Sequence, residues 1–198
     1  MNFDIFPALA LFAFVSSATP GPNNLMLMAS GANYGFRRTL PHMVGISVGF
    51  LVMMVATGLG LVGIFDAFPI SYVVLKVASV LYMLWLAWKI AHAAPIQAHQ
   101  AEGRPMTFLQ AAAFQWVNPK AWAMALTAVT VYVADNGDWM LMIGAIFFAA
   151  VNLPSVTIWT VMGQQMARLL VKPARLRAFN WTMAVLLVAS LYPVLQMG

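Results

Sequence analysis

The chain consists largely of long apolar runs that show neither one-sided helical periodicity nor the strict alternation of a half-buried strand. Six runs reach the roughly 20 residues that a helix needs to cross a bilayer: residues 5–31, 40–64, 70–91, 108–133, 139–163 and 179–197. Strands of a membrane barrel would alternate apolar and polar side chains, and these runs do not. The pattern predicts an all-α membrane protein with six transmembrane helices in a single domain, residues 1–198.

Two of the runs, the first and the fourth, contain residues that do not continue a helix. The first includes Thr19-Pro20-Gly21-Pro22-Asn23-Asn24, and the fourth includes Asn118-Pro119-Lys120. Each proline removes a backbone donor and clashes with the preceding turn, and in lipid the freed carbonyls must be satisfied by protein or cavity water. We therefore expect both breaks to face the interior of the bundle. A third, milder interruption is expected around Asn152 and Pro154.

The two main breaks fall at equivalent places in the order of helices. Each broken run begins a group of three, so residues 1–91 and 108–198 form two units joined by a polar connection at 92–107. Three-helix units in tandem have opposite orientations in a membrane. The sequence therefore predicts two inverted three-helix repeats with broken helices one and four. This prediction rests on the matching hydropathy and the matching breaks, because the halves share little sequence identity.

Composition excludes several other classes of protein. Only 8% of the 198 residues are charged and 63% are apolar, whereas soluble proteins carry about 25% charged residues. A soluble domain, a disordered chain and a nucleic-acid binder are therefore disfavoured. The absence of cysteine excludes disulfides, thiolate metal sites and a cysteine nucleophile.

The charges also predict an orientation. Eight of the ten basic residues lie in or beside the odd-numbered connections, namely Arg37, Arg38, Lys89, Arg104, Arg168, Lys172, Arg175 and Arg177, whereas the other side holds Asp4, Asp66, Asp135 and Asp138. By the positive-inside rule the odd-numbered connections are cytoplasmic and both termini face outward. A cleaved signal peptide is disfavoured because the chain starts without a basic residue. A re-entrant first segment, which would place the N-terminus inside, stays open.

The breaks carry chemistry suited to an anionic ligand. Asn118-Pro119 is a favourable pair for the N-cap and first turn of a helix, and Thr19-Pro20 and Gly21-Pro22 offer the same in the first run. A half-helix that begins there points unpaired N–H groups and a partial positive charge inward, which attracts a carboxylate. Lys120 lies near mid-membrane, where a charge costs about 2.5–3.5 kcal/mol, so we interpret it as functional.

Three further polar residues are candidates for coupling or gating: Lys76, Asn152 and His42. Lys76 could equally extend its ammonium to the membrane surface, and His42 could carry protons. The histidines lack metal-ligand spacing and the apolar runs contain no Asp or Glu, so we expect no metal site, no cofactor and no enzymatic activity. Gly45 and Gly49 form a GxxxG pair that is typical of helix packing.

These residues resemble the LysE/RhtB family of bacterial amino-acid exporters. The resemblance rests on the two break motifs, on Gly31, Gly35, Gly45 and Gly49, on Leu75-Lys76-Val77-Ala78 with Tyr82 and Trp85, and on Trp159, Gly163 and Asn180. It covers essentially the whole chain and implies a small multi-pass exporter of the bacterial inner membrane, driven by the proton gradient. Two departures are Phe50, where many members carry an acidic residue, and Ser79, where a glycine is usual. The missing carboxylate disfavours a strongly cationic substrate.

We therefore expect secondary-active, proton-coupled export of an amino acid or a derivative, with a neutral one favoured. The expected substrate-binding residues are Thr19, Pro20, Gly21, Pro22, Asn23, Asn24, Asn118, Pro119 and Lys120. Expected partners are the substrate, protons and the lipid bilayer but no nucleic acid, and a homodimer is one assembly left open. The alternative function is a channel or efflux route for another small anion. An intramembrane enzyme would need convergent acids or a nucleophile with its base, which the runs lack.

Overall fold

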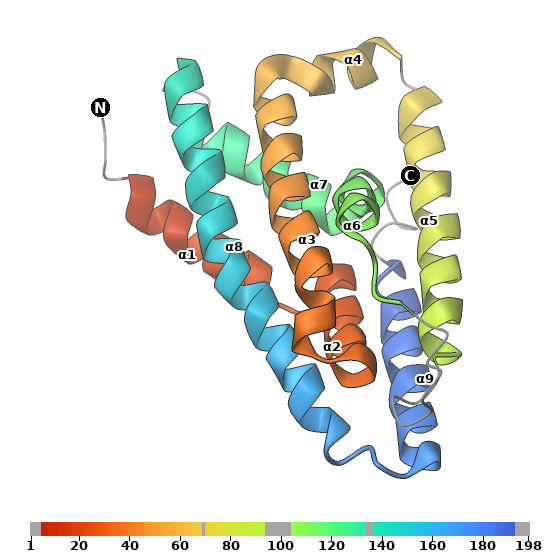
Figure 1. Cartoon of the computed structure of the whole chain (residues 1–198). Helices are drawn as coiled ribbons and strands as arrows, with labels where there is room; N and C mark the ends of the chain where they lie inside the picture. Colours follow the sequence, from red (N-terminus) through yellow and green to blue (C-terminus); the bar gives the residue numbers. More distant parts are fainter. Residues whose placement is uncertain (1–4, 69, 94–103, 134–136, 193–198) are drawn as a thin grey trace.

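The structure, a computed structural model, describes residues 5–68, 70–93, 104–133 and 137–192 (Figure 1). Its regular segments within these ranges are all helical, which confirms the predicted all-α class. In chain order they are α1 (Ile5–Ala18), α2 (Pro22–Tyr34), α3 (Phe36–Ala56), η1 (Thr57–Leu61), α4 (Val62–Ala67), α5 (Ile70–Ala91), α6 (Phe108–Phe114), η2 (Gln115–Val117), α7 (Pro119–Thr127), η3 (Ala128–Val133), α8 (Gly137–Ala167) and α9 (Pro173–Ala189). Asp4, Glu102, Asp135, most of the 92–107 connection and the end of the sixth predicted run lie outside the described residues.

Among the described residues, three helices are long and apolar enough to cross a membrane by themselves, judged by length and composition. They are Phe36–Leu61, which combines α3 and η1, together with α5 and α8. They coincide with the second, third and fifth runs predicted from hydropathy. The first and fourth runs are each divided into shorter helices, so the arrangement of six spans stays a prediction.

The predicted interruption near Asn152 is wrong, because α8 continues through Pro154. One isolated proline removes a single helical hydrogen bond and can be accommodated by a bend. The two main breaks differ because each also contains an extended residue. Gly21 has φ −178° and ψ 177°, and Asn118 has φ −94° and ψ 107°.

The last helix begins earlier than the run at 179–197 predicts. α9 starts at Pro173 with Lys172 at its N-cap position, and proline suits the first turn of a helix because that turn leaves its N–H groups unpaired. Hydropathy misses this turn because it contains basic side chains, Arg175 and Arg177.

Each broken run packs against a long helix from the other half of the chain. α1 and α2 pack on α8, whereas α6 packs on α3. The long helices also pair between halves, α3 with α8 and α5 with α9, and in each pair the two helices run in opposite directions (Figure 1). Exchanging the halves maps the contact of α1 with α8 onto that of α6 with α3, but the extensive packing of α2 on α8 has only a slight counterpart between α7 and α3.

Small residues permit the closest of these crossings. A Cβ atom on Gly31 of α2 would collide with the backbone at Thr160, and one on Gly163 of α8 would collide with the backbone at Met28. Gly45 and Gly49 lie against α6, where a Cβ on Gly49 would stand 2.5 Å from Ala112 Cα. The predicted packing role of the GxxxG pair is confirmed.

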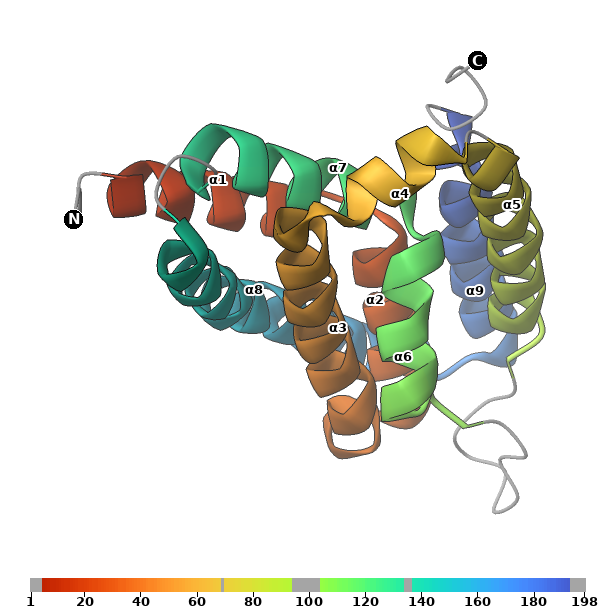
Figure 2. The ribbon, with the colours of Figure 1, turned by 90° about the horizontal axis from the view of Figure 1, so that it is seen from above.

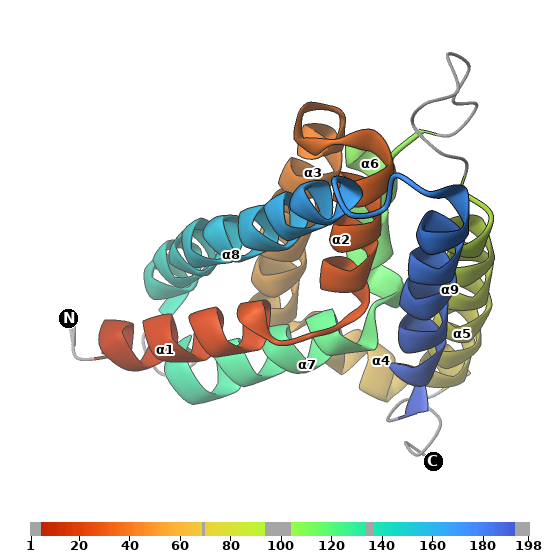
Figure 3. The same ribbon diagram turned by 90° about the horizontal axis from the view of Figure 1, so that it is seen from below.

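The two broken runs approach each other; at the first break Gly21 and Pro22 are buried, as expected, whereas Thr19 and Pro20 are exposed. Seen from above and from below, α1 and α7 lie side by side, while α2 and α6 lead away from them in another direction (Figure 2 and Figure 3). The segment that joins α1 to α2 consequently lies next to the start of α7.

Candidate functional site

The first break separates α1 from α2 with an extended segment. α1 ends at Ala18, Gly21 is extended, and α2 begins at Pro22 without a side-chain cap. The last carbonyls of a helix have no partner within it, and the prolines supply no N–H to replace one. The carbonyls of residues 17–20 must therefore find donors elsewhere in the protein.

Donors for these four carbonyls come from three other helices. Asn24 Nδ2 of α2 donates to the oxygens of Ser17 (2.7 Å) and Thr19 (2.8 Å). Trp159 Nε1 of α8 donates to the oxygen of Ala18 (3.1 Å). Lys120 Nζ of α7 donates to the carbonyls of Thr19 and Pro20.

At the second break, hydrogen bonds to backbone groups come from side chains near in sequence. η2 ends at Val117, and Asn118 then caps α7, since its Oδ1 accepts a hydrogen bond from the backbone N–H of Lys120 at 3.1 Å. Trp122 Nε1 donates to the carbonyl of Trp116 at 2.9 Å. The predicted cap and first-turn pair, Asn118 with Pro119, is confirmed.

Lys120 joins the two breaks directly. Its Nζ donates to the carbonyl of Thr19 at 2.7 Å, to the Thr19 hydroxyl at 2.9 Å and to the carbonyl of Pro20 at 3.4 Å. Gly21 makes room for this side chain, because a Cβ there would stand 2.7 Å from Lys120 Cδ. A cation from the second half of the chain thus rests on the exposed acceptors of the first half.

A pair of amides forms a second bridge between the breaks. Asn23 Nδ2 donates to Gln115 Oε1 at 2.8 Å, and Gln115 Nε2 donates to Asn23 Oδ1 at 3.2 Å. Gln115 is fully buried and also donates to the carbonyl of Ala111 at 2.9 Å. Both amides are therefore committed to holding the two halves together in this conformation.

Asn152 connects the site to the long helices. Its Nδ2 donates to Ser17 Oγ at 3.0 Å, and its Oδ1 accepts from Ser47 Oγ at 3.1 Å. Asn152 is on α8 and Ser47 on α3, so this buried chain of hydrogen bonds links both long helices to the end of α1.

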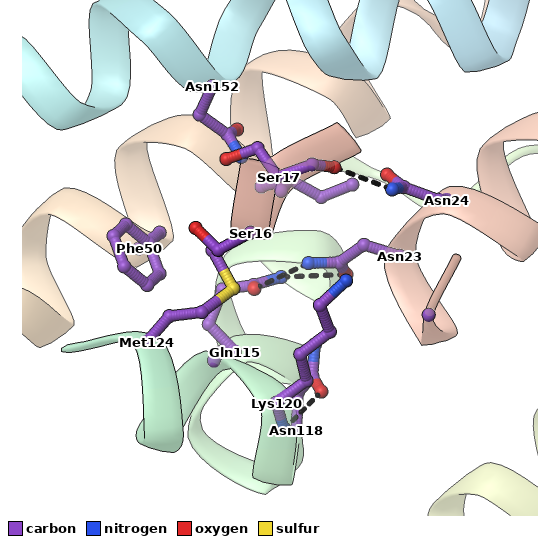
Figure 4. A pocket seen from close by; sticks show the side chains of 13 residues that line it. Ser16, Ser17, Asn23, Asn24, Phe50, Gln115, Asn118, Lys120, Met124 and Asn152 are labelled. Carbon is purple, nitrogen blue, oxygen red and sulfur yellow. Dashed lines mark hydrogen bonds between the residues drawn. The ribbon is translucent and has the colours of Figure 1, made fainter. Parts of the chain in front are cut away.

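A small polar cavity lies where these groups meet (Figure 4). Its volume of about 20 Å³ leaves room for about one water molecule, so this conformation is too tight for an amino acid. Figure 4 shows Lys120 extending from α7 toward Asn23 of α2. The described side chains that line the cavity include no Asp or Glu; they belong to Ser16, Ser17, Asn23, Asn24, Ile46, Phe50, Gln115, Asn118, Lys120, Ala121, Met124 and Asn152, with Gly21 completing the wall.

Most of the residues predicted for the site gather here. Thr19 and Pro20 contact Lys120, and Pro22 and Pro119 begin the two half-helices. Lys76, on α5, does not line the cavity, and His42 lines a different one. The lining residues not singled out from sequence are chiefly Ser16, Ser17, Ile46, Gln115, Ala121 and Met124. The sequence does contain a signal for Gln115, because an amide within an apolar run near a break is costly to bury unless it forms hydrogen bonds.

Comparisons with known proteins agree on one family. The family model of the LysE type translocator matches residues 14–191. The cysteine/O-acetylserine efflux protein of Klebsiella pneumoniae is 30% identical over 194 residues, covering 95% of both chains. The protein of the same description from Escherichia coli strain K12 is 29% identical over 193 residues, covering 95% of this chain and 96% of its own. The comparison with solved structures found no match.

Proposed function

Because this chain belongs to the LysE type translocator family, we propose that it exports an amino acid or an amino-acid derivative across the bacterial inner membrane. Two similar proteins are described as cysteine/O-acetylserine efflux proteins and match nearly end to end. Cysteine and O-acetylserine are accordingly the first substrates to test on this chain.

The contact between Lys120 and Thr19 carries the proposal, because it has the charge pattern of a zwitterion site. The Lys120 ammonium can bind a carboxylate, and the carbonyls of Thr19 and Pro20 can accept from an ammonium. In this structure the two sets of groups bind each other. An amino acid placed between them would satisfy both, with its carboxylate on Lys120 and its ammonium on the carbonyls.

The lining of the cavity supports a substrate without a cationic side chain. Phe50 lies on its wall and is buried, at the position where many members of the family that the chain resembles carry an acidic residue. The uncharged Ser16, Asn23 and Asn152 are the kinds of group that bind a hydroxyl, thiol or ester oxygen. We therefore keep the preference for a neutral substrate.

Export requires the site to open, since the cavity is too small for an amino acid. In the proposed mechanism the two halves are inverted repeats that rock against each other around the breaks and expose Lys120 to one side of the membrane at a time. The reciprocal packing of α1 on α8 and of α6 on α3 supports such a repeat. Both termini are proposed to be periplasmic from the distribution of basic residues.

The decisive experiment measures export of O-acetylserine and cysteine by cells that express the wild type, Lys120→Ala or Lys172→Ala. Removing a charged hydrogen-bonding partner costs about 2–5 kcal/mol, so Lys120→Ala should lower the export rate by about thirtyfold or more. Lys172, in the connection between α8 and α9, serves as the matched control and should leave export unchanged. Full export by Lys120→Ala would remove this lysine from the mechanism.

Proton coupling is tested in sealed vesicles that contain the purified protein. A coupled exporter accumulates O-acetylserine against its gradient when a proton gradient is imposed, and a proton ionophore abolishes the accumulation. A channel, the alternative function, would only let the two concentrations equalise. Passive equilibration by the wild type, with or without the proton gradient, would therefore replace the exporter by the channel.

A further inference from the structure

A second cavity of about 60 Å³ lies between α2, α3, α5 and the residues just before α6. It has room for a few water molecules and is larger than the cavity at the breaks. Its wall includes Lys89 near the end of α5 and Arg104 ahead of α6. Both belong to the connection whose basic residues predict a cytoplasmic position, so the cavity lies toward that side.

The most unusual member of this wall is His42 of α3. Its side chain is 1% exposed, and neither ring nitrogen has a hydrogen-bond partner in the part of the chain that the structure describes. A buried polar group without a partner destabilises a protein by about 1–3 kcal/mol. An imidazole kept in this state indicates a partner that is not part of the chain.

Neighbouring polar groups on the same wall are already bonded. Asn33 Nδ2 donates to Asn180 Oδ1 and to the carbonyl of Ala29, both at 2.8 Å. Ser30 Oγ pairs with Thr39 Oγ1 at 2.9 Å. Among the buried side chains of this lining that the structure describes, His42 is the one whose polar atoms have no hydrogen-bond partner, and the less buried Tyr34, Lys89 and Arg104 line the same cavity.

The charges on the wall indicate an anion. Lys89 and Arg104 are both exposed and both line the cavity, and the described lining residues include no Asp or Glu. Two cations at the opening raise the local concentration of anions, and an imidazole N–H deeper in the cavity can donate to a carboxylate.

The cavity is aligned with the site at the breaks. On α3, His42 lines the second cavity and Ile46, one turn later, lines the first. On α2, Met26 lines the second cavity and Asn23 and Asn24 line the first. Met26 and Ile46 are buried side chains of one apolar cluster, and a substrate that moves from the second cavity to the first would meet this apolar layer.

We propose that this cavity is a cytoplasm-facing subsite for the carboxylate of the transported amino acid, with His42 as its inner ligand and Lys89 and Arg104 at its opening. The substrate then passes the layer of Met26 and Ile46 to reach Lys120. This inference rests on the proposed export of amino acids. It adds a binding step that acts only on the cytoplasmic face.

The subsite is tested by measuring transport of labelled O-acetylserine from each face. Inside-out vesicles expose the cytoplasmic face to the added substrate, and right-side-out vesicles expose the other. We expect Arg104→Gln to raise KM in inside-out vesicles about threefold, as an exposed charge does, and His42→Leu to raise it about tenfold. KM in right-side-out vesicles should stay at the wild-type value in both variants.

Two control variants and a stability measurement separate binding from folding. Arg168→Gln removes an exposed cation that does not line the cavity, and Met43→Leu changes a buried neighbour of His42 with little change in volume; neither should alter KM on either face. His42→Leu removes two unpaired polar atoms, so its melting temperature should equal or exceed that of the wild type.

Three outcomes overturn the subsite. The first is a KM on the cytoplasmic face that equals the wild-type value in both Arg104→Gln and His42→Leu. If His42→Leu does not fold, His42→Gln takes its place in this comparison. The second is an equal rise of KM on both faces. Both leave export by the wild type, and hence the proposed function, intact. The third is no transport of O-acetylserine or cysteine by the wild type, which overturns the proposed function and the subsite together.

Discussion

The two breaks that meet at Lys120 arise from similar sequences but are stabilised in different ways. Both place proline at the start of a half-helix, Pro22 in α2 and Pro119 in α7. The break before α7 is stabilised by neighbours in sequence, through the Asn118 cap and the bond from Trp122 to the carbonyl of Trp116.

The break before α2 depends on tertiary contacts instead. Three of the four carbonyls in residues 17–20 receive hydrogen bonds from Trp159 or Lys120, which belong to the other half of the chain. Asn24, on the far side of the break, bonds the fourth. If the halves move apart as proposed, these acceptors would lose partners, whereas the donors and cap of the second break would move as one unit.

In the proposed mechanism this difference gives the two breaks distinct roles. The second is a preformed helix start that carries the Lys120 cation. The first is a set of acceptors whose partners can be exchanged, which is what a site needs if substrate is to replace an internal contact. The comparison suggests three measurements.

The largest effect is expected from a substitution of Gly21, the residue of the first break that makes room for the Lys120 side chain. In Gly21→Val the new side chain would displace Lys120, because even a Cβ atom would lie 2.7 Å from Lys120 Cδ. Valine suits the extended backbone of Gly21, so folding should be preserved. We expect the rate of O-acetylserine export to fall about fiftyfold, equivalent to ~2.3 kcal/mol.

The control for this substitution is Gly63→Val in α4, where an added Cβ would meet no atom within 4 Å. It should export at the wild-type rate. Normal export by Gly21→Val would show that Lys120 does not need its position beside the first break.

A smaller effect, on stability, is expected from the amide that spans the first break. Asn24→Leu removes the donor to the carbonyls of Ser17 and Thr19 and should lower the free energy of unfolding by about 1.5 kcal/mol. Asn118→Ala removes a local cap and should lower it by about 1 kcal/mol or less. Denaturant titration in mixed micelles measures both, and a larger loss for Asn118→Ala would reverse the comparison.

The smallest effect is expected for the amide bridge between the breaks. A double-mutant cycle with Asn23→Leu and Gln115→Leu should give a coupling energy of about 0.6 kcal/mol, the usual size for hydrogen bonds between membrane helices. The same titration measures it. A coupling of zero would mean that the two amides, despite distances of 2.8 and 3.2 Å, do not hold the halves together.

Several site residues could be anticipated from the sequence because their signals are local. Lys120 is conspicuous as a charge within an apolar run, and the breaks follow from proline and glycine. The sequence predicts Asn152 as a candidate for coupling or gating and as part of an interruption that α8 does not have; its amide lines the cavity and bonds Ser17. Its position there follows from the packing of α8 against α1, which no local pattern encodes.

Other features could not be anticipated. Lys76 has the same signal as Lys120, a cation inside an apolar run, but α5 carries it away from the cavity at the breaks. Gln115 is only an isolated amide in the sequence, and it acquires a role by facing Asn23 from 92 residues away. For His42 the sequence indicates a polar residue in an apolar helix, whereas its complete burial without a partner depends on which helices surround it.

Thus the sequence by itself determined the helical membrane class and the positions of both breaks. These depend on the hydropathy of consecutive residues and on proline geometry, which act within one or two helical turns. The tertiary structure alone decided that Lys120 rests on Thr19, that Asn23 faces Gln115 and that His42 has no hydrogen-bond partner among the described residues. Hydrogen bonds form only between groups that packing brings within about 3 Å, and here close helix crossings such as that of Gly31 with Gly163 help to set those distances.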